Sequence, residues 1–162
     1  MMNIEKLFQI QKELDMKILK EHQLEGKDLV PRKILALLVE LGELANETRC
    51  FKYWSLKSPA EKKVILEEYV DCLHFILSIG LEKGFLYLSF EEINAPETVT
   101  GQFMEVFANI TALQFNQREE NYTKLWKSFV KLGVGLGFDY KEIEESYLMK
   151  NKINHQRQAE GY

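Results

Sequence analysis

Apolar residues recur at every third or fourth position along most of this 162-residue chain. This spacing places them on one face of an α-helix, because a helix turns once every 3.6 residues or so. In the segment from about residue 4 to residue 20, that face consists of Leu7, Ile10, Leu14 and Ile18. Three prolines and nine glycines are too few for an all-β sandwich, which needs a turn every eight to twelve residues or so. The chain is therefore predicted to be all-α.

Start and stop signals divide the chain into six expected helices. The first four cover about residues 4–20, 31–49, 59–83 and 99–115, with Pro31 in the first turn of the second and Gly84 after the third. The third begins at Ser58-Pro59-Ala60-Glu61, which combines a capping box with proline at the first helical position. The fifth follows Asn121 as its cap, and the sixth follows Asp139, which forms a second capping box with Glu142. Residues 85–97 form a connection without a period, and residues 1–162 are predicted to be a single domain, a bundle of about six helices.

Composition limits the location and the partners of the chain. Acidic residues outnumber basic ones by 25 to 21, which argues against the broad cationic face of a protein that binds nucleic acid polymers. No apolar run is long enough to cross a membrane, and the charged N-terminal segment is neither a signal peptide nor an anchor. The two cysteines, Cys50 and Cys72, lie inside apolar helical patterns, so a reducing interior is favoured over a disulfide scaffold. We expect a cytoplasmic protein that binds neither nucleic acid polymers nor membranes.

Two of the expected helices carry carboxylates beside their apolar faces. Glu68 and Asp71 share a helical face with Cys72, Phe75 and Ile79. On the preceding helix, an acidic stripe borders the apolar stripe; its members are Glu40, Glu43 and Glu47. Acidic stripes are commonly solvated or neutralised by basic residues, but no Lys or Arg occurs from residue 64 to residue 81. Antiparallel packing of the two helices would bring the acids together, and buried carboxylates are costly unless they are protonated, paired or bound to a cation.

The acids follow the pattern Glu40-x-x-Glu43 and Glu68-x-x-Asp71, which suits a hard divalent cation. Mg²⁺ and Mn²⁺ prefer carboxylate and water oxygens, so these four residues are the candidate metal ligands of a central acidic metal site. A di-iron centre is the alternative, but it pairs its acids with two Glu-x-x-His motifs. Only His74 lies three residues after an acid, and we expect it to pack or to support the site.

Two further groups of polar residues suggest an anionic and a nucleoside-like ligand. Lys150, Asn154 and Arg157 recur at helical spacing and form a cationic face that suits phosphates, although an exposed basic helix has the same pattern. Gln11 and Asp15 lie one helical turn apart among apolar residues, which suits the edge of a base or sugar, although surface and capping roles are common for such pairs.

The stretch after the second expected helix is aromatic and irregular. Phe51, Lys52 and Trp54 lie in it and are candidates for a stacking platform or a lid, although aromatic clusters between helices also cover cores.

Several motifs resemble those of a known family. The two acidic pairs resemble the signature of the all-alpha NTP pyrophosphatase superfamily. Within it, further pieces look like the dimeric all-alpha dUTP diphosphatases (dUTPases), and they span nearly the whole chain in order. They are Leu-Phe-Gln-Ile-Gln11-Lys-Glu-Leu-Asp15, Phe51-Lys52-Tyr53-Trp54, Glu68-Tyr-Val-Asp71-Cys-Leu-His74-Phe and Lys150-Asn-x-x-Asn154-x-x-Arg157-Gln-x-x-Gly161-Tyr162.

The resemblance implies hydrolysis of dUTP to dUMP and pyrophosphate by water that bound Mg²⁺, or Mn²⁺, activates. The four acids would hold the metal, and one of them, Glu43, would orient or deprotonate the attacking water. Lys150 and Arg157 would bind the phosphates, while Gln11, Asp15 and Asn154 would contact the nucleoside. The resemblance also implies a homodimer, with the Phe51–Trp54 loop and the aromatic residues Phe103 and Phe107 as lid or interface. Two alternatives stay open: the same chemistry on another nucleoside triphosphate, and a non-catalytic helical protein that binds a metal.

Overall fold

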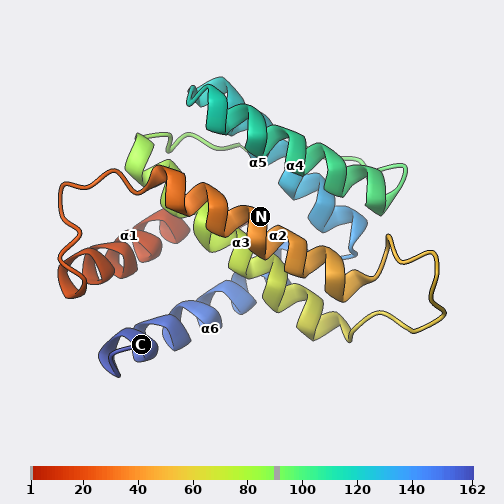
Figure 1. The fold of residues 1–162 in the computed structure, drawn as a ribbon, viewed down its shortest axis with the longest axis horizontal. Helices are drawn as coiled ribbons and strands as arrows, with labels where there is room; N and C mark the ends of the chain where they lie inside the picture. Colours follow the sequence, from red (N-terminus) through yellow and green to blue (C-terminus); the bar gives the residue numbers. More distant parts are fainter. Residues whose placement is uncertain (1, 90–91) are drawn as a thin grey trace.

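The computed structural model describes residues 2–89 and 92–162, and in these residues it contains six α-helices and no strand (Figure 1). The all-α prediction is confirmed. The helices are α1 (Ile4–Glu21), α2 (Val30–Thr48), α3 (Lys62–Lys83), α4 (Val99–Phe115), α5 (Glu119–Gly135) and α6 (Tyr140–Ala159). In the described part of the chain, every helix is too short or too polar to cross a bilayer.

Helix α3 is the centre of the bundle. It packs against α2 along most of its length, and α1 and α6 contact it on one side of this pair. The α4–α5 hairpin lies on the other side, through contacts of α4 with α2 and of α5 with α3 (Figure 1). The side chains of α1, α3 and α6 therefore meet in a space that α4 and α5 do not reach.

Buried tyrosines tie α3 to its neighbours. The hydroxyl groups of Tyr69 and Tyr122 donate hydrogen bonds to main-chain carbonyls of α5 and α3, at 3.0 and 2.8 Å. Each hydroxyl lies against a glycine, Gly133 for Tyr69 and Gly80 for Tyr122, where a Cβ would collide with it. These two contacts satisfy the buried hydroxyls and bring the helices to close distances.

Two predicted helix starts are wrong. Helix α3 begins at Lys62 instead of Pro59, and its N-cap, Glu61, makes no side-chain capping bond. The reason is that the Ala60 N–H donates to the carbonyl of Glu47 at the end of α2, at 3.0 Å, so the Ser58–Ala60 segment is tied to α2 and does not start a helix. Helix α5 begins at Glu119, and the Asn121 side chain donates to the Asn116 carbonyl instead of capping the helix.

Other helix ends match the prediction. Asp139 and Glu142 form the expected capping box at the start of α6. Gly84, with a φ of 74°, ends α3 in the left-handed conformation that glycine adopts without steric cost. One cysteine differs from expectation: Cys72 is buried in α3, but Cys50 is exposed in the turn that follows α2.

Candidate functional site

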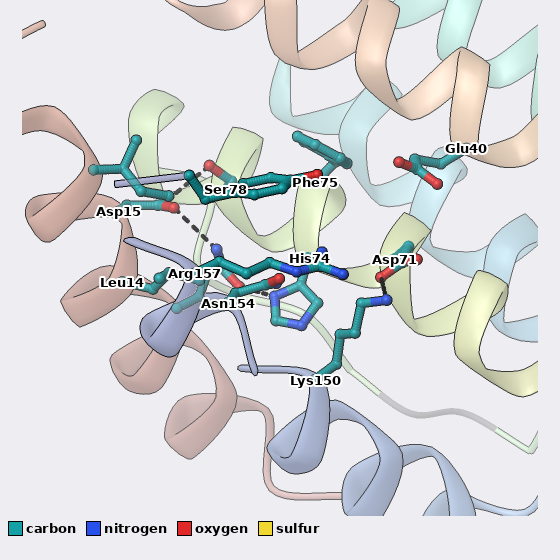
Figure 2. A pocket seen from close by; sticks show the side chains of 13 residues that line it. Leu14, Asp15, Glu40, Asp71, His74, Phe75, Ser78, Lys150, Asn154 and Arg157 are labelled. Carbon is teal, nitrogen blue, oxygen red and sulfur yellow. Dashed lines mark hydrogen bonds and ion pairs between the residues drawn. The ribbon is translucent and has the colours of Figure 1, made fainter. Parts of the chain in front are cut away.

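A pocket of about 300 Å³ lies where α1, α3 and α6 meet, with one residue of α2 at its edge (Figure 2). The lining residues include seven of the residues predicted from the sequence: Gln11, Asp15, Glu40, Asp71, Lys150, Asn154 and Arg157. These residues come from four helices: α1, α2 and α3, which follow one another, and α6 at the other end of the chain. The fold thus gathers these seven polar side chains around one pocket, whereas the predicted ligands Glu43 and Glu68 are not among the residues that line it.

At one end of the pocket lie the acids of α2 and α3. Glu40, Glu68 and Asp71 each offer one carboxylate oxygen, and these three oxygens lie within 4.8 Å of one another. One oxygen of Glu40 and one of Glu68 are buried without a hydrogen-bond partner among the described residues. Glu43 lies one turn after Glu40, with an exposed side chain. The donor set suits a divalent cation, since unpartnered carboxylate oxygens are what such an ion requires.

Crowding of these acids perturbs their ionisation. Burial, together with the charges of Asp71 and Glu43, raises the pKa of Glu40 from 4.5 to about 7. Burial and the same two neighbours raise the pKa of Glu68 to about 7. The pKa of Asp71 is also raised by burial, although the nearby Lys150 opposes the change. Without a cation, the cluster resists carrying its full negative charge near neutral pH.

Two basic residues of α6 face the acids. The ammonium nitrogen of Lys150 lies 3.1 Å from Asp71 Oδ1, so part of the acidic cluster is neutralised from another helix. The guanidinium of Arg157 lies 5.1 Å from the ring centroid of Tyr162, and both residues line the pocket. Acidic and basic groups are therefore adjacent at this end, an arrangement suited to phosphates bound together with a cation.

At the other end of the pocket, Gln11 and Asp15 belong to a network of hydrogen bonds. Gln11 Nε2 donates to Asp15 Oδ1 at 2.9 Å, and Ser78 Oγ donates to Asp15 Oδ2 at 2.8 Å. Gln11 Oε1 accepts from the Tyr147 hydroxyl at 2.8 Å and pairs with His74 Nδ1 at 2.6 Å. Burial raises the pKa of Asp15, while the bonds from Gln11 and Ser78 lower it. Surface and capping roles do not describe this pair, because Gln11 is only 3% exposed and both residues bond to other helices.

His74 is a buried, neutral ring. Its imidazole stacks on Tyr147 with ring centroids 4.3 Å apart, and burial, assisted by the charge of Lys150, lowers its pKa to about 3. It lines the pocket but lies outside the group of three acids suited to a metal.

The two ends are separated along the length of the pocket. Figure 2 shows Asp15 and Ser78 at one side and Glu40 and Asp71 at the other, with Arg157 between them. A ligand that fills the pocket would thus meet hydrogen-bonding groups at one end and a charged cluster at the other.

The aromatic loop lies elsewhere. Phe51, Lys52 and Trp54 are not among the residues that line this pocket; they follow α2 at the end of the α2–α3 pair that points away from α1 (Figure 1). The rings of Phe51 and Trp54 pack edge to face with their centroids 6.0 Å apart, and Trp54 is 64% exposed. The prediction for Phe103 is wrong, because its side chain is buried in the core and is not accessible to a lid or an interface.

The sequence interpretation missed several residues of the pocket. Phe75 and Ser78 lie one and two turns beyond Asp71 on the same face of α3, so helical spacing places both of them beside it. Tyr147, one turn before Lys150 on α6, does not line the pocket but bonds to Gln11, and its fully buried side chain has the pattern of an ordinary core aromatic residue. Tyr162 follows the last helix and gives no periodic signal.

Comparison with known protein families gives a match over nearly the whole chain. A protein-family model described as dUTPase matches residues 3–162 of the chain. No curated protein matches it. The family match includes every residue that lines the pocket, from Gln11 to Tyr162.

Proposed function

The chain belongs to the dUTPase family, and on this premise we propose that it cleaves dUTP to dUMP and pyrophosphate in a magnesium-dependent reaction. The family gives the chain dUTP diphosphatase activity, a hydrolase reaction; the metal, the residues and the mechanism are our proposal. The observation that carries it is the pocket in which a cluster of carboxylates, two basic side chains and a buried amide–carboxylate pair meet.

Glu40, Glu43, Glu68 and Asp71 are the proposed ligands of Mg²⁺, with Mn²⁺ as a substitute. The unpartnered oxygens of Glu40 and Glu68 and the raised pKa values of the cluster support this assignment, because a bound cation would satisfy both. When bound, such an ion neutralises phosphate charge and lowers the pKa of coordinated water.

Glu43 is the proposed base. Its exposed carboxylate lies next to Glu40 on the solvent side of the cluster, where a water molecule can approach. In the reaction, the oxygen of water bonds to one of the two phosphorus atoms that flank the α–β bridging oxygen, the bond from that phosphorus to the bridging oxygen breaks, and dUMP and pyrophosphate separate. Glu43 accepts the proton that the water loses and later releases it to solvent.

Lys150 and Arg157 are the proposed phosphate ligands. Lys150 already lies against Asp71, so its ammonium group is adjacent to the acids that would hold the cation. The planar guanidinium of Arg157 can donate two parallel hydrogen bonds to a phosphate. Gln11, Asp15 and Asn154 then contact the nucleoside at the other end of the pocket.

We further propose a cytoplasmic homodimer in which each chain is one domain, residues 1–162. Exposed apolar side chains support an interface: Leu35 and Val39 on α2 are 63% and 52% exposed, and Met104 on α4 is 67% exposed. In this proposal the loop with Phe51, Lys52 and Trp54 serves the pocket of the partner subunit as a lid or stacking platform, since it does not line the pocket of its own chain.

The test is release of pyrophosphate from dUTP, dTTP, dCTP and UTP, with Mg²⁺ and with a chelator. We expect efficient cleavage of dUTP alone and loss of activity in the chelator. Similar turnover of all four nucleotides would contradict the assignment of dUTP as the substrate, and full activity in the chelator would contradict the metal site.

A further inference from the structure

The orientation of the Gln11 amide is determined from two sides. Its Nε2 donates to Asp15, while its Oε1 accepts from the Tyr147 hydroxyl and from His74 Nδ1. An amide oxygen has two lone pairs, so Oε1 is fully used. Rotation of the amide by 180° would place its oxygen against the Asp15 carboxylate, which has no proton to donate. One N–H of Nε2 therefore remains available in a fixed direction.

The His74 contact also fixes the form of the imidazole. Because Gln11 Oε1 can only accept, Nδ1 must carry the proton, and Nε2 is buried without a partner among the described residues. His74 is thus a donor to Gln11 and, at the same time, a packing surface for the Tyr147 ring.

Ser78 holds the second member of the pair. Its hydroxyl donates to Asp15 Oδ2, on the oxygen that Gln11 does not contact. Each carboxylate oxygen keeps a free lone pair, so Asp15 stays an acceptor. The charged groups around Asp15 are Lys33 and Glu82, which form an ion pair at 2.7 Å on the neighbouring helices α2 and α3. Lys33 and Glu82 act on Asp15 in opposite directions, which leaves the Gln11 and Ser78 bonds as the main support of its carboxylate.

We propose that Tyr147, His74 and Ser78 are positioning residues that hold Gln11 and Asp15 as a fixed donor–acceptor pair for the nucleoside. The inference rests on the proposed function, since it assigns the partner of this pair as part of the substrate. It adds three residues to the site, and none of them contacts phosphate or metal in this assignment.

A ligand group that matches the pair must offer an acceptor and a donor side by side. Two parts of deoxyuridine have this chemistry: the C=O and N3–H edge of the base, and the 3′-hydroxyl of the sugar. Both are neutral, and both would leave the pair unsatisfied if removed.

The test compares Tyr147→Phe and Ser78→Ala with wild type in steady-state hydrolysis of dUTP. Each variant removes one hydroxyl and keeps the backbone and the packing volume nearly intact. Tyr122→Phe and Ser128→Ala are matched controls, because Tyr122 and Ser128 are also buried, but their hydroxyls donate to main-chain carbonyls and not to Gln11 or Asp15. Loss of one orienting hydrogen bond predicts an increase in KM of about fivefold with kcat nearly unchanged, and the controls should keep the wild-type KM.

Substrate analogues identify the group of the nucleoside that Gln11 and Asp15 bind. The 3′-deoxy analogue of dUTP lacks the sugar hydroxyl, and the N3-methyl analogue lacks the base donor. For the analogue that lacks the recognised group, wild type should show a raised KM, and the two variants should add nothing further. Disappearance of the variant effect with one analogue supports the inference and identifies base or sugar as the source.

Three results would overturn it. Wild-type KM in both variants, with dUTP turnover intact, overturns the positioning roles alone. The positioning roles are also overturned if each variant raises KM by the same factor with dUTP and with both analogues. A purely structural effect would not depend on which hydrogen-bonding group the substrate lacks. Absence of dUTP turnover by wild type overturns the proposed function, and the inference with it.

Discussion

The ammonium nitrogen of Lys150 lies 3.1 Å from Asp71 Oδ1, and this contact connects the last helix of the chain to the acidic cluster of α2 and α3. The pair is about four-fifths buried on both sides, so its interaction is stronger than that of a surface ion pair. It places a cation next to the carboxylates that would hold a metal, without any basic residue on the acid-bearing face of α3.

Replacement of Lys150 should therefore affect the substrate more than the fold. For Lys150→Ala, we expect kcat/KM for dUTP to fall by roughly 10- to 100-fold, the usual range for loss of a hydrogen bond to a charged group. Lys152→Ala is the control, because Lys152 is exposed on the same helix and does not line the pocket. Equal activity of the two variants would remove Lys150 from the phosphate site.

Glu43→Gln should abolish turnover and leave nucleotide binding measurable. The amide keeps the size and part of the hydrogen bonding of the carboxylate, but it cannot accept a proton from water. Turnover by pyrophosphate release and binding of dUTP by calorimetry separate the two effects. A rate near that of wild type would exclude Glu43 as the base.

Metal should stabilise the protein through the acidic cluster. Because Glu40, Glu68 and Asp71 lie within reach of one cation, millimolar Mg²⁺ should raise the melting temperature, as any ligand of the native state does. Glu40→Gln should reduce this increase and should itself be more stable than wild type in chelator, since it relieves repulsion. If Mg²⁺ leaves the melting temperature unchanged, and Glu40→Gln is no more stable than wild type in chelator, the carboxylates of the cluster do not repel one another.

The raised pKa values predict a dependence of stability on pH in the chelated protein. The pKa of Glu68 rises from 4.5 in the unfolded chain to about 7 in the fold, so the folded state binds the extra proton between these values. Its contribution to stability is present below pH 4.5 and is lost as the pH rises through 7. The pKa of His74 is lowered to about 3, so its contribution has the opposite sign. It increases the stability of the fold as the pH rises from 3 to the ordinary histidine value of about 6.5.

Comparison with Glu68→Gln isolates the carboxylate. The melting temperature of wild type relative to this variant should decrease steadily from pH 5 to pH 8, because only wild type must ionise the half-buried acid. Parallel curves for the two proteins would show that Glu68 titrates normally.

Local sequence patterns predicted the parts of the site that lie within one helix or between neighbouring helices. Glu40 with Glu43, and Glu68 with Asp71, are each one turn apart, and helices that follow each other usually pack antiparallel. Helical spacing places Ser78 on the face of α3 that carries Asp71, but its bond to Asp15 could not be predicted, because it depends on which helix meets α1. The bond from Tyr147 to Gln11 was missed for the same reason, since no local pattern encodes the packing of α6 on α1. The start of α3 was wrong for a similar reason, since the Ala60 N–H bonds to Glu47 across the loop and overrides the capping signal of Ser58.

The aromatic loop gives the last prediction, which concerns the proposed dimer. If Trp54 serves the pocket of the partner subunit, Trp54→Ala should raise KM for dUTP although Trp54 lies outside the pocket of its own chain. Mixing this variant with Glu43→Gln then tests the arrangement. In a mixed dimer, the chain with intact acids receives an intact Trp54 from its partner, so one of the two pockets is complete. Random reassociation of equal amounts should restore about a quarter of the wild-type sites, whereas a loop that acts within its own chain would restore none, because no chain in the mixture carries both an intact loop and an intact base.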